Sequence, residues 1–274
     1  MIKILLILLC VLLFLCLFYL WCLKGSGRRK QMQPFYQWNY AHRGLHDDQK
    51  PENSMAAFRA ALEAGCGIEL DVHLLKDGNL AVMHDSSLVR TTGQSGDIED
   101  LTTEELDRYC LNGTQESIPR FQQVLALFDG KAPLIVELKC HKGNVVPLCE
   151  AACRMLDSYH GLYCIESFDP RIVRWLRRNR PNILRGQLSE NWMGKKLPIP
   201  GILKWLLTYH IGNFYSRPDF IAYKFEDRKA FGTDICRKVL GIPGVSWTLK
   251  TKEQYDAAVQ EGWIPIFEGF QITK

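Results

Sequence analysis

Two carboxylates and a histidine alternate along one apolar segment, and they are the first residues with an evident capacity for chemistry. The segment 67–73 reads GIELDVH. Side chains in a β-strand point alternately to opposite faces, so Glu69, Asp71 and His73 would share one face while the aliphatic residues take the other. Two carboxylates on one face of a buried strand are costly unless a cation or a basic group compensates them.

A second strand candidate that carries a carboxylate follows at 134–139. It reads LIVELK, and the same alternation places Glu137 and Lys139 on one face. A single Glu at a strand end is more often solvated or salt-bridged than bound to a metal. Three carboxylates in apolar strands each need an explanation, however. Together, Glu69, Asp71 and Glu137 would form an oxygen-rich site for a hard cation, Mg²⁺ or Ca²⁺.

Two histidines, His42 and His84, each end a strand candidate. Cleavage of a phosphodiester requires one proton to be removed from the nucleophile and one to be donated to the leaving alkoxide, and histidine titrates in the range for either task. Arg43 adds a planar donor fork suited to a phosphate. An isolated histidine is more often structural, but two histidines beside an arginine and several carboxylates favour catalysis.

The elements that must position these residues alternate between strand and helix. The strand candidates are 38–42, 67–74, 79–84, 134–139, 162–167, 183–188, 219–223 and 244–248. The helix candidates are 54–64, 103–109, 121–128, 145–159, 170–179, 228–239 and 253–261. This alternation predicts an α/β protein with a parallel sheet, and a span of about 235 residues fits a closed TIM (β/α)₈ barrel, whose strand ends carry the active site. An open doubly wound sheet is the alternative, although no Gly-rich dinucleotide loop supports it.

One stretch, 190–217, interrupts the alternation between the sixth and seventh strand candidates. It is an aromatic and basic insertion that includes Trp192, Trp205, Phe214 and Lys204. The simpler interpretation is an extra helix packed on the barrel. The other is an interfacial helix that lies in a membrane and overhangs the substrate.

The N-terminus predicts a membrane anchor. From Ile4 to Leu23 there is no charged residue, and a helix of roughly 20 apolar residues spans a bilayer core. A cleaved signal peptide is the alternative, but the run exceeds the usual apolar region of about 7–15 residues and no typical cleavage site follows. The chain is therefore expected to divide into an anchor at 1–24, a basic linker at 25–37 and a catalytic domain at 38–274.

Charge and cysteine usage bear on orientation. Lys3 precedes the apolar run, whereas Lys24, Arg28, Arg29 and Lys30 follow it, so the positive-inside rule places the domain in the cytoplasm. Seven cysteines outside the apolar run, an odd number, are typical of reduced thiols. An extracytoplasmic domain stays the alternative. The net charge of +4 is small and concentrated near the N-terminus, which gives no reason to expect a nucleic-acid partner.

These residues resemble the glycerophosphodiester phosphodiesterase family, in the form of a membrane-anchored, bacterial-type member. The resemblance rests on motifs whose order and spacing agree from about residue 38 to 250. In chain order they are HRG at 42–44, PENS at 51–54, ELDV at 69–72, KDG at 76–78, HD at 84–85, RTT at 90–92, IP at 118–119, ELK at 137–139, SF at 167–168 and WT at 247–248.

The resemblance implies a TIM barrel that hydrolyses glycerophosphodiesters to an alcohol and glycerol 3-phosphate with a divalent cation. It implies that His42 and His84 are the general acid/base pair and that Glu69, Asp71 and Glu137 hold the metal. It further implies that substrate or phosphate is bound by Arg43, Lys139 and Trp247. Glu52 would tie the first loop to the site or serve as a further ligand.

Two segments depart from the family pattern. Family members commonly close with a strand of the type GIITD, whereas this chain has IPIFEGF at 264–270, which leaves the closing strand in doubt. The insertion at 190–217 also lies outside the pattern. Two alternatives therefore stay open: a lysophospholipase-D-type hydrolysis of lysophospholipids at the membrane, and a catalytically inactive, membrane-tethered binding barrel. Cyclic phosphate is a further conceivable product, if a substrate hydroxyl replaces water.

Overall fold

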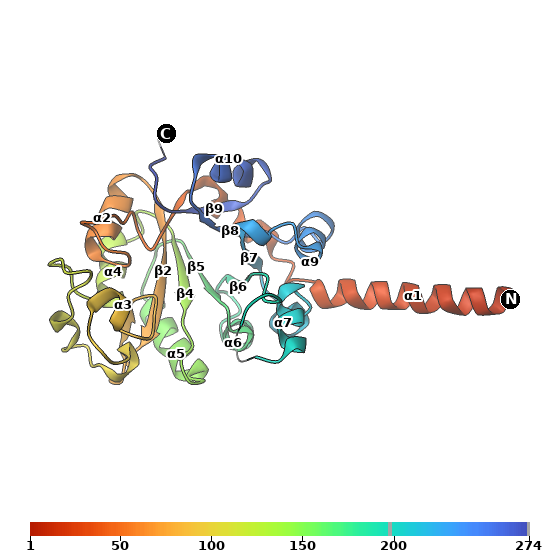
Figure 1. The fold of residues 1–274 in the computed structure, drawn as a ribbon, viewed down its shortest axis with the longest axis horizontal. Helices are drawn as coiled ribbons and strands as arrows, with labels where there is room; N and C mark the ends of the chain where they lie inside the picture. The colour runs from red at the N-terminus through yellow and green to blue at the C-terminus, as the bar shows by residue number, and fades with distance from the viewer. Residues whose placement is uncertain (197–198, 273–274) are drawn as a thin grey trace.

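The computed structural model, which describes residues 1–196 and 199–272, contains a closed barrel of eight parallel strands (Figure 1). In order around the barrel these are β1 (Tyr40–His42), β2 (Gly67–Leu74), β4 (Leu134–Leu138), β5 (Tyr163–Ser167), β6 (Arg185–Ser189), β7 (Phe220–Lys224), β8 (Gly244–Leu249) and β9 (Ile264–Phe267). The barrel closes because β1 pairs in parallel with both β2 and β9. The prediction of a TIM barrel is confirmed.

One expected barrel strand lies elsewhere. The segment 79–84 forms β3 (Leu80–Val82), which pairs with the barrel strand β2 and runs antiparallel to it. A tight turn at Gly78, whose φ is +84°, folds the chain back before a crossover helix can form. The eighth barrel strand is instead β9, within the segment that departs from the family pattern.

Helices lie around the outside of the barrel, except the N-terminal helix, which extends away from it (Figure 1). In chain order they are α1 (Ile2–Leu23), η1 (Arg29–Gln37), α2 (Met55–Glu63), α3 (Val89–Thr92), η2 (Ile98–Asp100), η3 (Leu106–Arg108), α4 (Phe121–Phe128), α5 (Val145–Leu156), α6 (Pro170–Asn179), α7 (Gly201–Thr208), α8 (Asn213–Ser216), η4 (Phe225–Asp227), α9 (Phe231–Asp234), η5 (Ile235–Val239) and α10 (Lys252–Gln260). Buried side chains such as Phe58, Phe121 and Phe128 fill the space between helices and strands. The barrel is thereby a packed core with its chemistry confined to one end.

Helix α1 projects away from the barrel (Figure 1), and it is long and apolar enough to cross a membrane. Only its last turn enters the domain, where Cys22 and Leu23 are buried. The Asn213 side-chain amide donates to the Leu23 carbonyl over 3.1 Å, and the Arg217 guanidinium donates to the carbonyls of Trp21 and Lys24 over 2.7 Å each. The end of α1 is therefore part of the domain's packing.

The segment 25–37 also packs against the barrel. It contains the 3-10 helix η1, in which Met32 and Phe35 are fully buried. Both side chains belong to a core cluster with Tyr40 and Ile266. This stretch is therefore folded, unlike the basic linker that we expected, because its apolar residues bury against the barrel. The division of the chain into three domains stays a prediction.

Asp219, fully buried just before β7, joins the segment after α1 to the barrel. Its carboxylate accepts hydrogen bonds from Ser26 Oγ, from Arg28 Nε over 2.8 Å and from the Arg185 backbone amide over 2.9 Å. The Asp219→Ala change should cost about 3–5 kcal/mol of unfolding free energy, because it leaves buried donors and the Arg185 charge without their partner. Urea unfolding in detergent, followed by circular dichroism, measures this cost.

The control is Asp157→Ala, which removes an exposed carboxylate 3.1 Å from Arg180. Its expected cost is below about 1 kcal/mol. Equal stability of the two variants would contradict the role given to Asp219.

Candidate active site

Three buried carboxylates meet at one end of the barrel. Asp71 and Glu137 stand directly opposite each other in the register of β2 and β4, and Glu69 lies two residues earlier on β2. One ligand atom from each of the three residues lies within 4.8 Å of the others. Neighbouring parallel strands place equivalent residues side by side at the mouth of a barrel. The three predicted metal-binding carboxylates are therefore brought together.

Two cations compensate Asp71. Lys139 Nζ lies 2.9 Å from Asp71 Oδ1 and 2.8 Å from Glu137 Oε1, and Arg43 Nε lies 3.3 Å from Asp71 Oδ2. The Asn53 amide donates to Asp71 Oδ2 over 2.8 Å. Burial acts to raise the pKa of Asp71, but Lys139 and Arg43 hold it well below its ordinary value. Asp71 is therefore a permanent anion at the centre of the site.

The other two carboxylates are not fully compensated. Burial raises the pKa of Glu137 to about 7, although the Lys139 ammonium acts to lower it. Burial, followed by repulsion from Asp71 and Glu137, raises the pKa of Glu69 well above its ordinary value. Oxygen donors that repel one another in a buried site match the ligand set of a hard divalent cation, whose charge would displace these protons.

Both predicted histidines border the carboxylate group. His42 Nδ1 lies 2.5 Å from Glu268 Oε2, and its Nε2 lies 3.8 Å from Glu69 Oε2. His84 Nδ1 lies 2.6 Å from Asp85 Oδ1. Both imidazoles line a cavity of about 40 Å³ that also reaches Glu69 and Glu137. In each histidine, Nδ1 therefore contacts a carboxylate beside the candidate metal site.

His84 reaches this place by a different route from the one we expected. It follows β3, which is not a barrel strand. The β2–β3 hairpin nevertheless brings the chain back beside Asp71, whose backbone carbonyl accepts a hydrogen bond from the Met83 amide over 3.1 Å. His73 supports the turn, with Nε2 3.2 Å from the His84 carbonyl oxygen and Nδ1 2.6 Å from Glu99 Oε1. His73 is thus a buried support of the hairpin.

Burial lowers the pKa of both active-site histidines. The pKa of His84 falls to about 4, with Lys139 and Arg43 adding to the effect while Asp71 opposes it. The pKa of His42 is also below its ordinary value because of burial, although its hydrogen bond to Glu268 acts to raise it. Burial therefore favours the neutral, proton-accepting form of both rings, while the carboxylate at each Nδ1 favours the protonated form.

The Glu52 carboxylate contacts two arginines. Its Oε1 lies 2.9 Å from Arg43 Nη1 and 2.7 Å from Arg90 Nη2. Glu52 therefore orients Arg43, and it is not among the three described carboxylates that come together as a metal-ligand group. The Trp247 ring, expected to bind substrate, lines the same small cavity as the histidines and packs edge-on against Phe168 with centroids 5.6 Å apart.

Sequence reasoning missed two carboxylates of the site. Glu166 on β5 pairs in register with Glu137 and is 1% exposed, and burial followed by repulsion from Glu137 raises its pKa well above its ordinary value. The alternation used for Glu137 would have found it. Glu268 directly follows β9, so its position depended on the closing strand that the sequence left in doubt.

Comparisons with known proteins show the family to which the chain belongs. The model of the glycerophosphoryl diester phosphodiesterase family matches residues 42–209. A glycerophosphodiester phosphodiesterase of Caldanaerobacter subterraneus subsp. tengcongensis is 31% identical over 237 residues, which cover 81% of this chain and 89% of that protein. A Bacillus altitudinis protein of the same name is 43% identical over 108 residues, 36% of this chain and 43% of that protein.

Among solved structures, an Oleispira antarctica phosphodiesterase in complex with its product sn-glycerol-3-phosphate superimposes with a TM-score of 0.71 at 21% identity, over 85% of this chain and 93% of that one. At this identity the likeness concerns the fold. Taken with the family match, it leaves no ambiguity about the class of protein: this chain belongs to the glycerophosphodiester phosphodiesterase family. The resemblance to the family is confirmed, and the chain is a phosphodiesterase; its membrane-anchored form stays a prediction.

The contact between Glu268 and His42 generates a prediction. Glu268→Gln keeps a hydrogen-bond acceptor but removes the negative charge that stabilises the imidazolium, so the pKa of His42 should fall further below its ordinary value. Nitrogen NMR of histidine-labelled protein in micelles follows this titration.

The matched control is Glu253→Gln, an exposed substitution on α10 that should leave the His42 titration in place. An unchanged His42 titration in Glu268→Gln would show that the carboxylate does not control this ring.

Proposed function

We propose that this chain hydrolyses glycerophosphodiesters to an alcohol and glycerol 3-phosphate with a divalent cation, Mg²⁺ or Ca²⁺, and with His42 and His84 as the acid/base pair. The observation that carries the proposal is the pair of imidazoles beside three buried carboxylates whose ligand atoms lie within 4.8 Å of one another. Acid/base groups next to a cation site are what phosphodiester hydrolysis requires.

Glu69, Asp71 and Glu137 would hold the cation. All three carboxyl groups are buried, and the pKa values of Glu69 and Glu137 are raised. These features support the role, because a bound cation would compensate the charge of all three carboxylates. When bound, the cation supplies positive charge against the negative charge that develops on the phosphoryl group. Glu166, next to Glu137, is a further buried carboxyl facing the same cavity.

The two histidines would move the protons. Glu268 and Asp85 each occupy one Nδ1, which leaves the Nε2 atoms available to the reacting groups. One imidazole, in its neutral form, would take the proton of the nucleophile, and the other, protonated beforehand, would give its proton to the leaving alkoxide. The carboxylates that contact Nδ1 would fix the ring orientation and stabilise the protonated form in turn.

Arg43, Lys139 and Trp247 would bind the substrate. Arg43 is oriented by Glu52 and Lys139 by Asp71 and Glu137, so both positive groups are fixed at the edge of the candidate metal site. Fixed cations suit a phosphate that gains charge during the reaction. Trp247 would contact the part of the substrate that carries no charge.

We propose further that α1 is a retained single-pass anchor with the catalytic domain on the cytoplasmic side. The positive residues after α1 support the orientation. The burial of Cys22 and Leu23 in the domain supports retention, because removal of α1 would take core residues with it.

The two alternatives differ in substrate or in chemistry. Lysophospholipids share the same glycerophosphodiester linkage, so a lysophospholipase-D-type reaction would use the same residues. A catalytically inactive binding barrel would be expected to have lost a histidine or a metal-binding carboxylate. This chain retains both histidines and all three carboxylates at one site, which favours catalysis.

The full chain in detergent should release choline or glycerol 3-phosphate from glycerophosphocholine in the presence of Mg²⁺ or Ca²⁺, and EDTA should abolish this activity. His42→Ala or His84→Ala should lower kcat by about 10²–10⁴-fold, because each removes a proton-transfer group. The exposed His160→Ala is the control and should leave kcat unchanged. A folded, cation-loaded preparation that cleaves no phosphodiester across a broad panel would refute the proposal.

Cation binding should release protons at pH 7, since Glu69 and Glu137 have raised pKa values and must lose their protons to serve as ligands. The affinity should therefore rise between about pH 6 and about pH 8. Calorimetry in buffers with different ionisation enthalpies counts the protons. In Glu137→Gln the proton release should shrink and the affinity should fall, and binding that is independent of pH would exclude these two ligands.

A further inference from the structure

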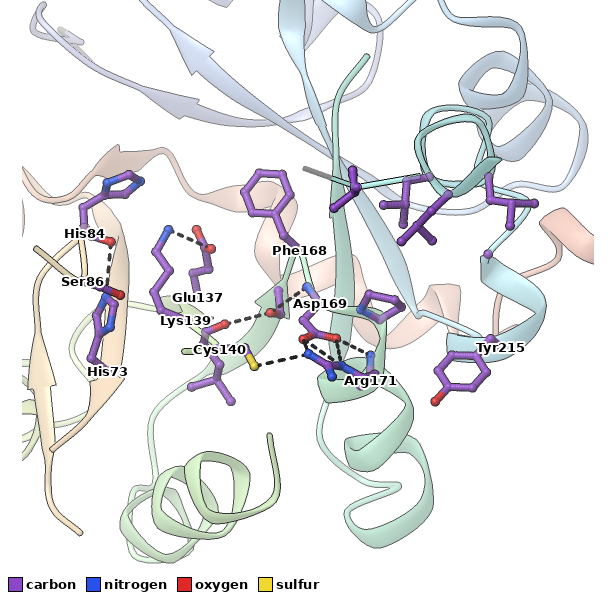
Figure 2. A pocket seen from close by; sticks show the side chains of 18 of the residues that line it. His73, His84, Ser86, Glu137, Lys139, Cys140, Phe168, Asp169, Arg171 and Tyr215 are labelled. Atoms are coloured by element: carbon purple, nitrogen blue, oxygen red, sulfur yellow. Dashed lines mark hydrogen bonds and ion pairs between the residues drawn. The ribbon is translucent and has the colours of Figure 1, made fainter. Parts of the chain in front are cut away.

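A second and larger cavity opens from the active centre. Its volume is about 790 Å³, and one side carries His84, Glu137 and Lys139. Figure 2 shows these three side chains on one side of the cavity and Tyr215 of α8 on the opposite side. The far side is apolar and is formed by five residues of α7 and α8, namely Leu203, Leu206, Leu207, Phe214 and Tyr215. The polar and apolar walls therefore belong to one continuous space.

This arrangement exceeds the needs of a small polar diester. Pockets of roughly 300–1,000 Å³ enclose ligands of drug size. Contact between aliphatic or aromatic side chains and a hydrophilic headgroup contributes no favourable binding free energy. An apolar wall that begins beside Lys139 and Glu137 instead suits a substrate whose phosphodiester is attached to a hydrocarbon chain.

Helix α7 is apolar on its outer side as well. Ile202 is 65% exposed and Trp205 is 42% exposed, while Leu206 and Leu207 turn towards the cavity. A helix at a water-exposed surface has one apolar face and one polar face. Contiguous apolar side chains on an outer face mark a contact with another apolar phase.

The contacts between the end of α1 and the helices around it identify this apolar phase. Helix α8 packs beside the end of α1, where Phe214 stacks on Trp21 with ring centroids 6.1 Å apart. On the other side of α1, Phe231 stacks on Tyr19 with centroids 6.3 Å apart. Figure 1 shows that α7 and α9 flank the base of α1, on the side of the barrel from which α1 projects. A bilayer that surrounds α1 would therefore also meet this face of the domain.

The charges beside α1 agree with a lipid surface. Lys24, Arg177 and Arg217 line a groove at the base of α1, and its described lining contains no carboxylate. The Arg217 guanidinium lies 4.7 Å from the centroid of the Trp21 ring. Aromatic rings and basic side chains at the end of a spanning helix are typical of the headgroup region, where the bases attract anionic lipid.

We propose that α7 and α8 lie in the surface of the bilayer that holds α1, and that the cavity beneath them takes the hydrocarbon chain of a single-chain glycerophospholipid. The chain would enter between α7 and α8, and its phosphodiester would reach His42 and His84. This inference rests on the proposed function and assigns its substrate class. The occupant of the outer face is the bilayer itself, because α1 joins the domain without a free linker.

The test uses the full chain in phosphatidylcholine and phosphatidylglycerol vesicles, with two substrates: lysophosphatidylcholine in the vesicle and glycerophosphocholine in solution. The double variant Ile202→Ser, Trp205→Ser should lower kcat/KM for the lysolipid by at least about tenfold, because it removes two large apolar contacts with the bilayer. Its activity on glycerophosphocholine should stay within about twofold of the unmodified chain, because neither residue lines the active centre.

The matched control is Val146→Ser, Val259→Ser, which removes two apolar side chains of similar exposure from α5 and α10, away from α1. This variant should leave both activities unchanged. Short-chain lysolipids below their micelle concentration then test the cavity alone. In the unmodified chain, kcat/KM should increase with chain length, and Leu203→Ser should reduce this increase.

The outcomes separate the two proposals. Hydrolysis of glycerophosphocholine with no preference for a hydrocarbon chain, or equal loss in the α7 variant and the control, overturns this inference and leaves the proposed function standing. No hydrolysis of either substrate by the unmodified chain overturns both. A lysolipid activity that depends on Ile202 and Trp205, together with the chain-length dependence, establishes the membrane-facing cavity.

Discussion

The burial of negative charge at one end of an otherwise apolar barrel is the constraint on which the rest of the structure depends. Asp71 and Glu137 face each other on adjacent strands, with Glu69 and Glu166 nearby, and all are nearly inaccessible to water. Removing several carboxylates from water is expensive, and their mutual repulsion adds to the cost. Lys139, which contacts two of them, offsets only part of this charge. Arg43 compensates Asp71 as well, and the remaining carboxyl groups respond to burial and repulsion with raised pKa values.

Polar contacts extend outward from this centre and hold each functional group in place. Arg43 is oriented by Glu52, which in turn contacts Arg90, and Arg90 contacts Asp85 beside His84. These contacts join the loop after β1 to the segment after β3, two parts of the chain that are distant in sequence. Groups held in this way lose little freedom when substrate binds, and such preorganisation is the main route by which electrostatic groups accelerate a reaction.

The same end of the barrel joins two environments of opposite polarity. The cavity between the histidines is small and is lined largely by ionisable side chains, whereas the larger cavity beside it has an apolar wall formed by α7 and α8. Phe168 lies at the junction and contributes to both. Because the end of α1 packs against α8, the apolar side of the site and the apolar N-terminal helix occupy one side of the molecule. A phosphodiester with one hydrophilic and one hydrophobic substituent matches this division.

The sequence by itself determined the barrel class and the three carboxylates, because a strand period of two fixes which side chains share a face, and parallel strands bring equivalent positions to one mouth. Only the tertiary structure decided how the barrel closes: β9 is the eighth strand, β3 turns back along β2, and Glu268 reaches His42 across 226 residues of chain. It also showed that 25–37 packs against the barrel, through Met32 and Phe35. Side-chain periodicity is local and can be read from neighbours in the chain, whereas strand pairing and closure depend on contacts between residues far apart, which no local pattern encodes.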